Sequence, residues 1–106
     1  MADEPRSNCT DWTAIHDFMP PRPARLRVHG KCTFPTPGFT VSFKPHVPQG
    51  INPVILLLDK VVTPPSGPEP DVVTTIDVQY EEQTDKHYTE VEVLPDKAKI
   101  KVEEVH

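Results

Sequence analysis

The sequence has few of the residues from which recognisable active sites are built. Its 106 residues include two cysteines, four glycines and one tryptophan, and no apolar run reaches 18 residues. Two cysteines are too few for a disulfide scaffold, four glycines cannot form a phosphate-binding loop, and the short apolar runs exclude a membrane span. Residues 1–10 lack the apolar centre of a secretory signal. We therefore expect a cytoplasmic protein, or an exported one if an export sequence precedes this one.

Net positive charge is also missing. The formal charge is −5, and the two parts of the chain differ in sign. Residues 1–60 hold seven Lys/Arg and five Asp/Glu, a net of +2, whereas residues 61–106 hold four and eleven, a net of −7. Nucleic-acid binding requires a basic field over a whole face, so this balance argues against a nucleic-acid partner. The opposite charges would let two copies, or a partner protein, meet end to end.

Proline is the residue that the chain has in excess, at 14 of 106 positions, more than twice the usual ~5%. This density excludes long helices and limits central strands. The prolines cluster between apolar runs and have no period, so they indicate loops rather than a polyproline ligand or a collagen. The longest of these loops spans residues 63–71, where four prolines make the chain stiff.

Between the loops, side chains alternate with the period of two that is typical of strands. Residues 24–34 put small and apolar side chains on one face and mostly basic ones on the other, and residues 39–44 repeat the apolar alternation. We expect these two segments to form a hairpin that pairs Phe34 with Phe39, Cys32 with Val41 and Gly30 with Phe43. Residues 54–62 are apolar on both faces and rich in β-branched residues, which favours a strand over a helix. Such a strand is either covered on both sides or lies at an interface.

The last third of the chain, residues 72–105, predicts a three-stranded meander. A first turn at 83–86 and a second at Pro95-Asp96 place apolar residues opposite apolar ones and acids opposite bases. The first hairpin would pair Val78 with Val91 and Ile76 with Val93. The second would pair Val93 with Ala98, Val91 with Ile100, Glu92 with Lys99 and Glu90 with Lys101.

The polar N-terminal residues 1–9 predict a flexible tail ahead of one domain of residues 10–106. Residues 10–19 have the spacing of one short helical turn, with Trp12, Ile15 and Met19 on one side. We expect Trp12 to cover an open end of the core. The alternative is that Trp12 is an aromatic anchor for a partner.

Six to seven short strands, tight turns and one crossing loop are typical of a small antiparallel β-sandwich, here with one short N-terminal helical turn. In this pattern the chain resembles the immunoglobulin and fibronectin type III class, which implies two packed sheets. The resemblance is one of topology only, because the cysteine and tryptophan spacing of antibody domains is missing. Cys9 and Cys32 are the only cysteines, and Trp12 precedes both inner strands.

No group of residues in the sequence points to catalysis or to a bound metal. The histidines lack the close pairs that zinc sites show, and we expect them to be solvated surface residues; they are His16, His29, His46, His87 and His106. Cys32 is on the inward face of its expected strand, where a cysteine is a small hydrophobic residue and not a nucleophile. We therefore expect no catalytic residue, no cofactor, no metal and no enzymatic activity.

Two surfaces are candidates for contact with a partner. Arg25, Arg27 and Lys31 share the outward face of the strand expected at 24–34, as a docking surface for an acidic partner or as a solvated face that protects an edge. The loop at 63–71 presents Pro64, Pro65, Pro68 and Pro70. A stiff exposed loop loses little entropy on binding, although rigidity there would also serve stability alone.

The function that this pattern favours is a non-enzymatic β-sandwich module for protein–protein interaction or structural support. It would contact an unidentified protein partner, or a second copy of itself, through the proline-rich loop or a sheet edge. One alternative is a carrier of a small ligand or a metal, with a pocket lined by Phe34, Phe39, Phe43 and Tyr80. Another alternative is a protease inhibitor that acts through the loop.

Overall fold

The computed structural model describes residues 8–106, and in that range the chain forms strands and connecting loops. None of these residues belongs to a helix that is long and apolar enough to cross a membrane. Seven strands follow in order: β1 Asn8–Asp17, β2 Arg25–Phe34, β3 Thr40–Pro45, β4 Ile55–Thr63, β5 Thr74–Gln83, β6 Glu90–Leu94 and β7 Ala98–Val105. The prediction of an all-β fold with six to seven strands is confirmed.

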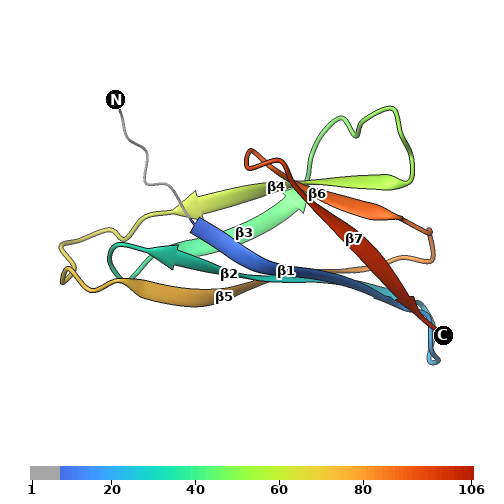
Figure 1. The fold of residues 1–106 in the computed structure, drawn as a ribbon, viewed down its shortest axis with the longest axis horizontal. Coiled ribbons are helices and arrows are strands. Elements are labelled where there is room, and N and C mark those ends of the chain that lie inside the picture. Colours follow the sequence, from blue (N-terminus) through green and yellow to red (C-terminus); the bar gives the residue numbers. More distant parts are fainter. Residues whose placement is uncertain (1–7) are drawn as a thin grey trace.

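The seven strands form one sheet that curls into a nearly closed barrel (Figure 1). The strand order is β3-β4-β6-β7-β1-β2-β5. Two neighbouring pairs, β1 with β7 and β4 with β6, are parallel, and the other pairs are antiparallel. Strands β3 and β5, at the two ends of this order, approach each other and share one part of the core. The expected two-sheet antiparallel sandwich is not confirmed, because the sheet is mixed and curls on itself.

The hairpin of β6 and β7 forms in the predicted register. Its four cross-strand pairs are Val93 with Ala98, Val91 with Ile100, Glu92 with Lys99 and Glu90 with Lys101. Val91 and Val93 are fully buried, and Ile100 is 6% exposed. Full burial of a valine contributes about 1.5–3 kcal/mol, so the inward face of this hairpin holds it firmly in register. Lys97, in the turn, has a φ of 60°.

The two other predicted hairpins are wrong. Strand β5 pairs with β2 along its whole length, from Arg25 opposite Gln83 to Phe34 opposite Thr74. Strand β6 lies between β4 and β7, and β3 pairs with β4. The error has a physical reason, because the same alternation that fits β5 to β6 also fits β5 to β2. The pairing with β2 adds opposite charges on the outward face, as at Arg27 and Glu81.

The helical turn predicted at residues 10–19 is also wrong, because this segment is part of β1. Strand β1 bulges between Thr10 and Thr13, and Asp11 there has a φ of 57°. The bulge places the half-buried Trp12 over Gly30. Of the predicted tail, residues 1–7 lie outside the described range, while Asn8 and Cys9 begin β1. Cys9 forms a disulfide with Cys32 of β2.

The strand predicted at 54–62 is confirmed as β4; its inward face is buried, whereas its outward face is only half-buried and includes the exposed Val61. Leu56, Leu58 and Lys60 point inward and are buried. On the outer side the segment 46–54 folds back on Leu57. The Gln49 side chain donates hydrogen bonds from Nε2 to the carbonyl oxygens of His46 and Leu57, and its Oε1 accepts one from the Leu57 amide. The Gln49 side chain thus pairs with the backbone N–H and C=O groups of Leu57 in β4.

Candidate functional site

Two proline-bearing loops meet at one end of the barrel (Figure 1). We name residues 35–39, between β2 and β3, and residues 64–73, between β4 and β5, the proline end. Gly38 lies where they touch. A Cβ atom at position 38 would lie 2.8 Å from Cβ of Pro65 and 3.3 Å from Cδ of Glu69, and Gly38 has a φ of 93°. Only glycine combines this backbone conformation with so close an approach.

The proline end carries two valines that the fold does not bury. Val72 is 56% exposed and Val73 is 72% exposed, directly before β5 begins at Thr74. The backbone around them is fixed. The Val72 amide donates to the carbonyl oxygen of Pro70 at 2.9 Å, and Oγ1 of Thr74 donates to the carbonyl oxygen of Val72 at 2.9 Å. This loop therefore offers apolar area in a defined position.

The structure places the four predicted loop residues together at the proline end. Pro64, Pro68 and Pro70 are exposed, and Pro65 is half-buried against the turn that contains Gly38. The acidic residues of the loop, Glu69 and Asp71, are exposed beside them. The apolar centre of this surface thus has an acidic rim.

The predicted basic residues lie on the outward face of β2, where strand β5 sets acids beside them. Arg25, Arg27 and Lys31 are all exposed. Glu81 lies 3.6 Å from Arg25 and 3.8 Å from Arg27, and Asp77 is the register partner of Lys31. The positive charge that this face offers to a partner is reduced accordingly. Since exposed ion pairs contribute little to stability, the pairing mainly changes the surface potential.

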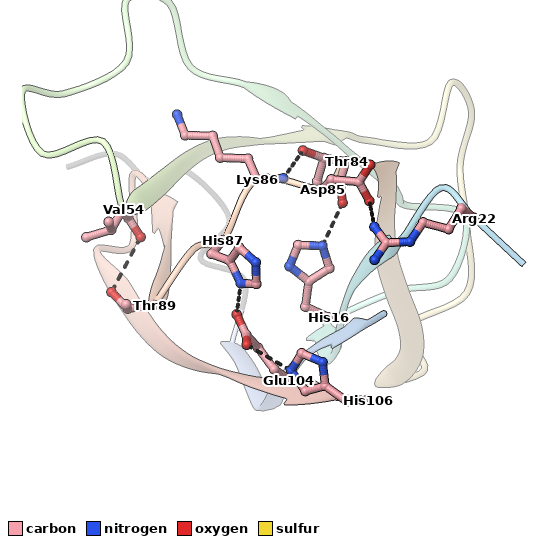
Figure 2. Close-up of polar contacts among 10 residues, drawn as sticks. All are labelled: His16, Arg22, Val54, Thr84, Asp85, Lys86, His87, Thr89, Glu104 and His106. Carbon is pink, nitrogen blue, oxygen red and sulfur yellow. Dashed lines mark hydrogen bonds and ion pairs between the residues drawn. The ribbon is translucent and has the colours of Figure 1, made fainter. Parts of the chain in front are cut away.

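At the opposite end of the barrel, segments distant in the sequence bring an aromatic ring and three histidines together. We name Phe18, His16, His87, Glu104 and His106 the histidine end. The ring of Phe18 stacks on His87 at a centroid distance of 4.5 Å and on His106 at 5.1 Å, and it lies 4.1 Å from His16. Figure 2 shows Glu104 between His87 and His106, with hydrogen-bond distances of 2.6 Å and 3.2 Å.

His16 is the fully buried member of the histidine end, which corrects the expectation that all five histidines are solvated. Its Nε2 lies 2.7 Å from the carbonyl oxygen of Thr84 (Figure 2), which can only accept, so Nε2 carries the proton. Nδ1 has no hydrogen-bond partner among the described residues. The contact with Thr84 fixes the loop between β5 and β6, which Asp85 also fixes through Arg22 at 3.0 Å and the Ala24 amide at 3.1 Å.

The histidine end holds one carboxyl group, that of Glu104, beside its three histidines. The pKa of the Glu104 carboxyl is lowered, first because His87 hydrogen-bonds to it and further because His106 does. Within residues 8–106, no three or more His, Cys, Asp or Glu side chains are grouped so that they could hold a metal ion. No sequence pattern predicts this cluster, since its members lie up to 90 positions apart, from residue 16 to residue 106.

Of the four aromatic residues proposed to line a ligand pocket, Phe34 is buried, and Phe39, Phe43 and Tyr80 are half-buried and pack against the core. Phe34 stacks on Phe39 at 4.5 Å, and Phe43 meets the edge of Trp12 at 6.0 Å. The hydroxyl of Tyr80 donates to Oε1 of Glu82, and burial and that carboxylate together raise the tyrosine's pKa. A hollow of about 360 Å³ lies where β1 and β7 separate, lined by Trp12, Thr13, Ala14, Lys99, Ile100, Lys101 and Glu103.

No protein-family model, curated protein or solved structure matches the chain. The geometry of the two ends and of the surface between them is therefore the basis for a functional proposal.

Proposed function

We propose that this chain is a non-enzymatic β-barrel module that binds a protein partner through its proline end and the adjoining edge of β5. The observation that supports this most is the pair Val72 and Val73. Both are largely exposed on a loop whose prolines and hydrogen bonds hold it in place. Exposed apolar area in a fixed position is the usual centre of a binding surface.

Rigidity favours binding at this loop. Four prolines restrict the backbone of residues 64–70, and Gly38 allows the neighbouring turn to pack against Pro65. A loop that is already ordered loses little conformational entropy when a partner docks. The acidic rim of Glu69 and Asp71 favours a partner whose own surface has an apolar hollow with basic residues around it.

The edge of the sheet extends this surface. Strand β5 pairs with β2 on one side, and its other edge faces β3 without pairing among residues 8–106. A strand with unpaired backbone groups can accept a strand from a partner. Val72 and Val73 lie just ahead of that edge, so a partner strand that added there would cover both.

The disulfide supports a location for this module. Disulfides form and persist in oxidising compartments and are rare in the cytosol. Since Cys9 and Cys32 are bonded, we propose that the protein works outside the reducing cytosol, the second of the two expectations from the sequence.

Site-specific photo-crosslinking in the cells that produce the protein tests the proposed surface. A photoreactive benzoylphenylalanine at Val73 should give one discrete adduct, and the double variant Pro64→Ala/Pro65→Ala should reduce its yield. The control position is Met19, which is 50% exposed and lies just beyond the end of β1, where its amide donates to Oδ1 of Asp17. An adduct of twice the chain mass would identify a second copy as the partner. Absence of an adduct from Val73, or the same adduct from Met19, would rule out this surface.

A further inference from the structure

Lys60 is a charged residue at an inward-facing position of β4, where the strand otherwise has leucines. Leu56, Leu58 and Lys60 alternate along the inward face, and the Lys60 side chain is only 2% exposed. Lysine is almost never fully buried without a partner. Its Nζ lies 2.5 Å from Oδ2 of Asp96 and donates a hydrogen bond to Sγ of Cys9 at 3.4 Å. One sulfur of the disulfide therefore rests against a buried ammonium group.

The two sulfurs of the disulfide have different surroundings. Cys9 is half-buried and has the Lys60 ammonium beside it. Cys32 is fully buried, in an apolar cluster with Phe34 and Val78. A neighbouring cation stabilises a thiolate, whereas an apolar surrounding disfavours it. On reduction, the negative charge would therefore reside on Cys9.

We propose that the reduced Cys9–Cys32 pair is a thiol–disulfide exchange site that closes readily and reopens slowly. Cys9 is its nucleophile, Lys60 holds the Cys9 thiolate, and Cys32 is the resolving cysteine. The co-substrate is the disulfide of a small thiol. This inference does not depend on the binding surface proposed above.

The closing reaction has two steps. The Cys9 thiolate attacks one sulfur of the small disulfide, so that a Cys9–thiol mixed disulfide forms and one thiolate leaves, to be protonated by water. Cys32 then attacks Sγ of Cys9, its proton passes to the departing small thiolate, and the second small thiol leaves. The protein dithiol is oxidised by two electrons, and the small disulfide is reduced to two thiols.

The reverse reaction meets two obstacles. Attack on the sulfur of Cys9, the less buried of the two cysteines, must expel the Cys32 thiolate into an apolar cluster, where it is a poor leaving group. Attack on Cys32 would expel the stabilised Cys9 thiolate, but Cys32 has no exposed surface. The Lys60 ammonium thus favours the first step of closure, and the burial of Cys32 protects the closed bond.

The role of Lys60 can be measured with Cys32→Ser, which leaves Cys9 as the only thiol. This variant should form a mixed disulfide with oxidised glutathione at pH 7. Mass spectrometry measures the rate at which the mixed disulfide forms. Addition of Lys60→Met should slow the reaction about tenfold, because the thiolate loses its cation. Addition of Asp96→Asn should leave the rate unchanged or raise it, because the ammonium is no longer shared with the Asp96 carboxylate. Equal rates with and without Lys60, or a slower reaction in Asp96→Asn, would overturn the proposal. The Asp96→Asn variant decides it if Lys60→Met does not fold.

The protection of Cys32 can be measured on the unaltered oxidised protein. Dithiothreitol should reduce the disulfide at least about a hundredfold more slowly in native buffer than in guanidinium chloride. In the folded protein, attack on either sulfur is slow, because Cys32 is buried and its thiolate is a poor leaving group. In the matched variant Cys9→Ser, Cys32 should resist alkylation until the protein unfolds. Reduction in native buffer as fast as in denaturant, or ready alkylation of Cys32, would contradict the asymmetry.

Discussion

Trp12 of β1 lies across Gly30 of β2 so closely that a Cβ atom at position 30 would come within 2.6 Å of the indole ring. The bulge at Asp11 sets this position, and Trp12 packs against both hydrophobic clusters of the barrel. The indole therefore joins two parts of the core that the curled sheet would otherwise keep apart. The sequence predicted Phe43 opposite Gly30, whereas the aromatic ring that lies on Gly30 is that of Trp12.

Replacement of Gly30 by alanine should therefore destabilise the protein. The added methyl group must displace the indole or the backbone, and overpacking of this kind costs about 1–3 kcal/mol. Urea denaturation followed by tryptophan fluorescence measures the change in the free energy of unfolding. Gly67→Ala is the matched control, since a Cβ atom there has nothing within 4 Å. Equal stabilities of the two variants would show that Trp12 does not lie on Gly30.

Replacement of Val91 by aspartate should abolish the cooperative thermal unfolding transition. Val91 is fully buried and pairs with Leu56 on one side and Ile100 on the other, so the charge would have no partner in the core. Val73→Asp makes the same chemical change at a site that is 72% exposed and should keep the transition. The two melting curves can be compared by circular dichroism. A cooperative transition in Val91→Asp would contradict the placement of β6 at the centre of the sheet.

The sequence was sufficient for the strands and for one of the predicted hairpins. The β6–β7 register was predictable because one register across a short turn gives suitable pairs on both faces of the hairpin. Val91 pairs with Ile100 on the inward face, and Glu92 pairs with Lys99 on the outward face. The same agreement between β5 and β6 was misleading. Period-two alternation determines the face on which a side chain lies but not the strand that is its neighbour. Strand β5 pairs with β2 over ten residue pairs.

The candidate sites differ in how far the sequence could reveal them. The proline end was predictable from composition, since Pro64, Pro65, Pro68 and Pro70 lie in one segment. The disulfide was not, because it depends on residues 8–17 forming a strand next to β2, which brings the Cα atoms of Cys9 and Cys32 to 4.0 Å. The histidine end and the burial of Lys60 depend on the same long-range strand order.

Replacement of Gly38 by alanine should separate the two loops of the proline end. Position 38 has a φ of 93°, and the new methyl group would lie 2.8 Å from Cβ of Pro65. Strain of this kind costs about 1–3 kcal/mol. Chemical denaturation should show that loss, and the amide resonances of residues 66–73 should shift while those of β6 and β7 stay in place. Unchanged resonances in the loop would show that residues 35–39 and 64–73 do not touch.

The carboxyl of Glu104 should titrate below its ordinary value of 4.5. The hydrogen bond from His87 is the first cause, so His87→Ala should return the titration midpoint toward the ordinary value. Because the pKa is lower in the folded state, the stabilisation from Glu104 is present above pH 4.5 and is lost as the pH falls through the folded-state value. An NMR titration of the side-chain carboxyl carbon measures both midpoints. Identical midpoints in the two proteins would contradict the contact with His87.

The proposed binding surface requires a rigid proline end, and backbone ¹⁵N relaxation of the free protein measures that rigidity. The order parameters at Val72 and Val73 should be about 0.8 or higher, as in ordered backbone. The variant Pro64→Ala/Pro65→Ala should lower them while the values in β6 and β7 stay unchanged. Order parameters below about 0.6 at Val72 and Val73 in the unaltered protein would mean a flexible loop, and they would contradict a preformed binding surface there.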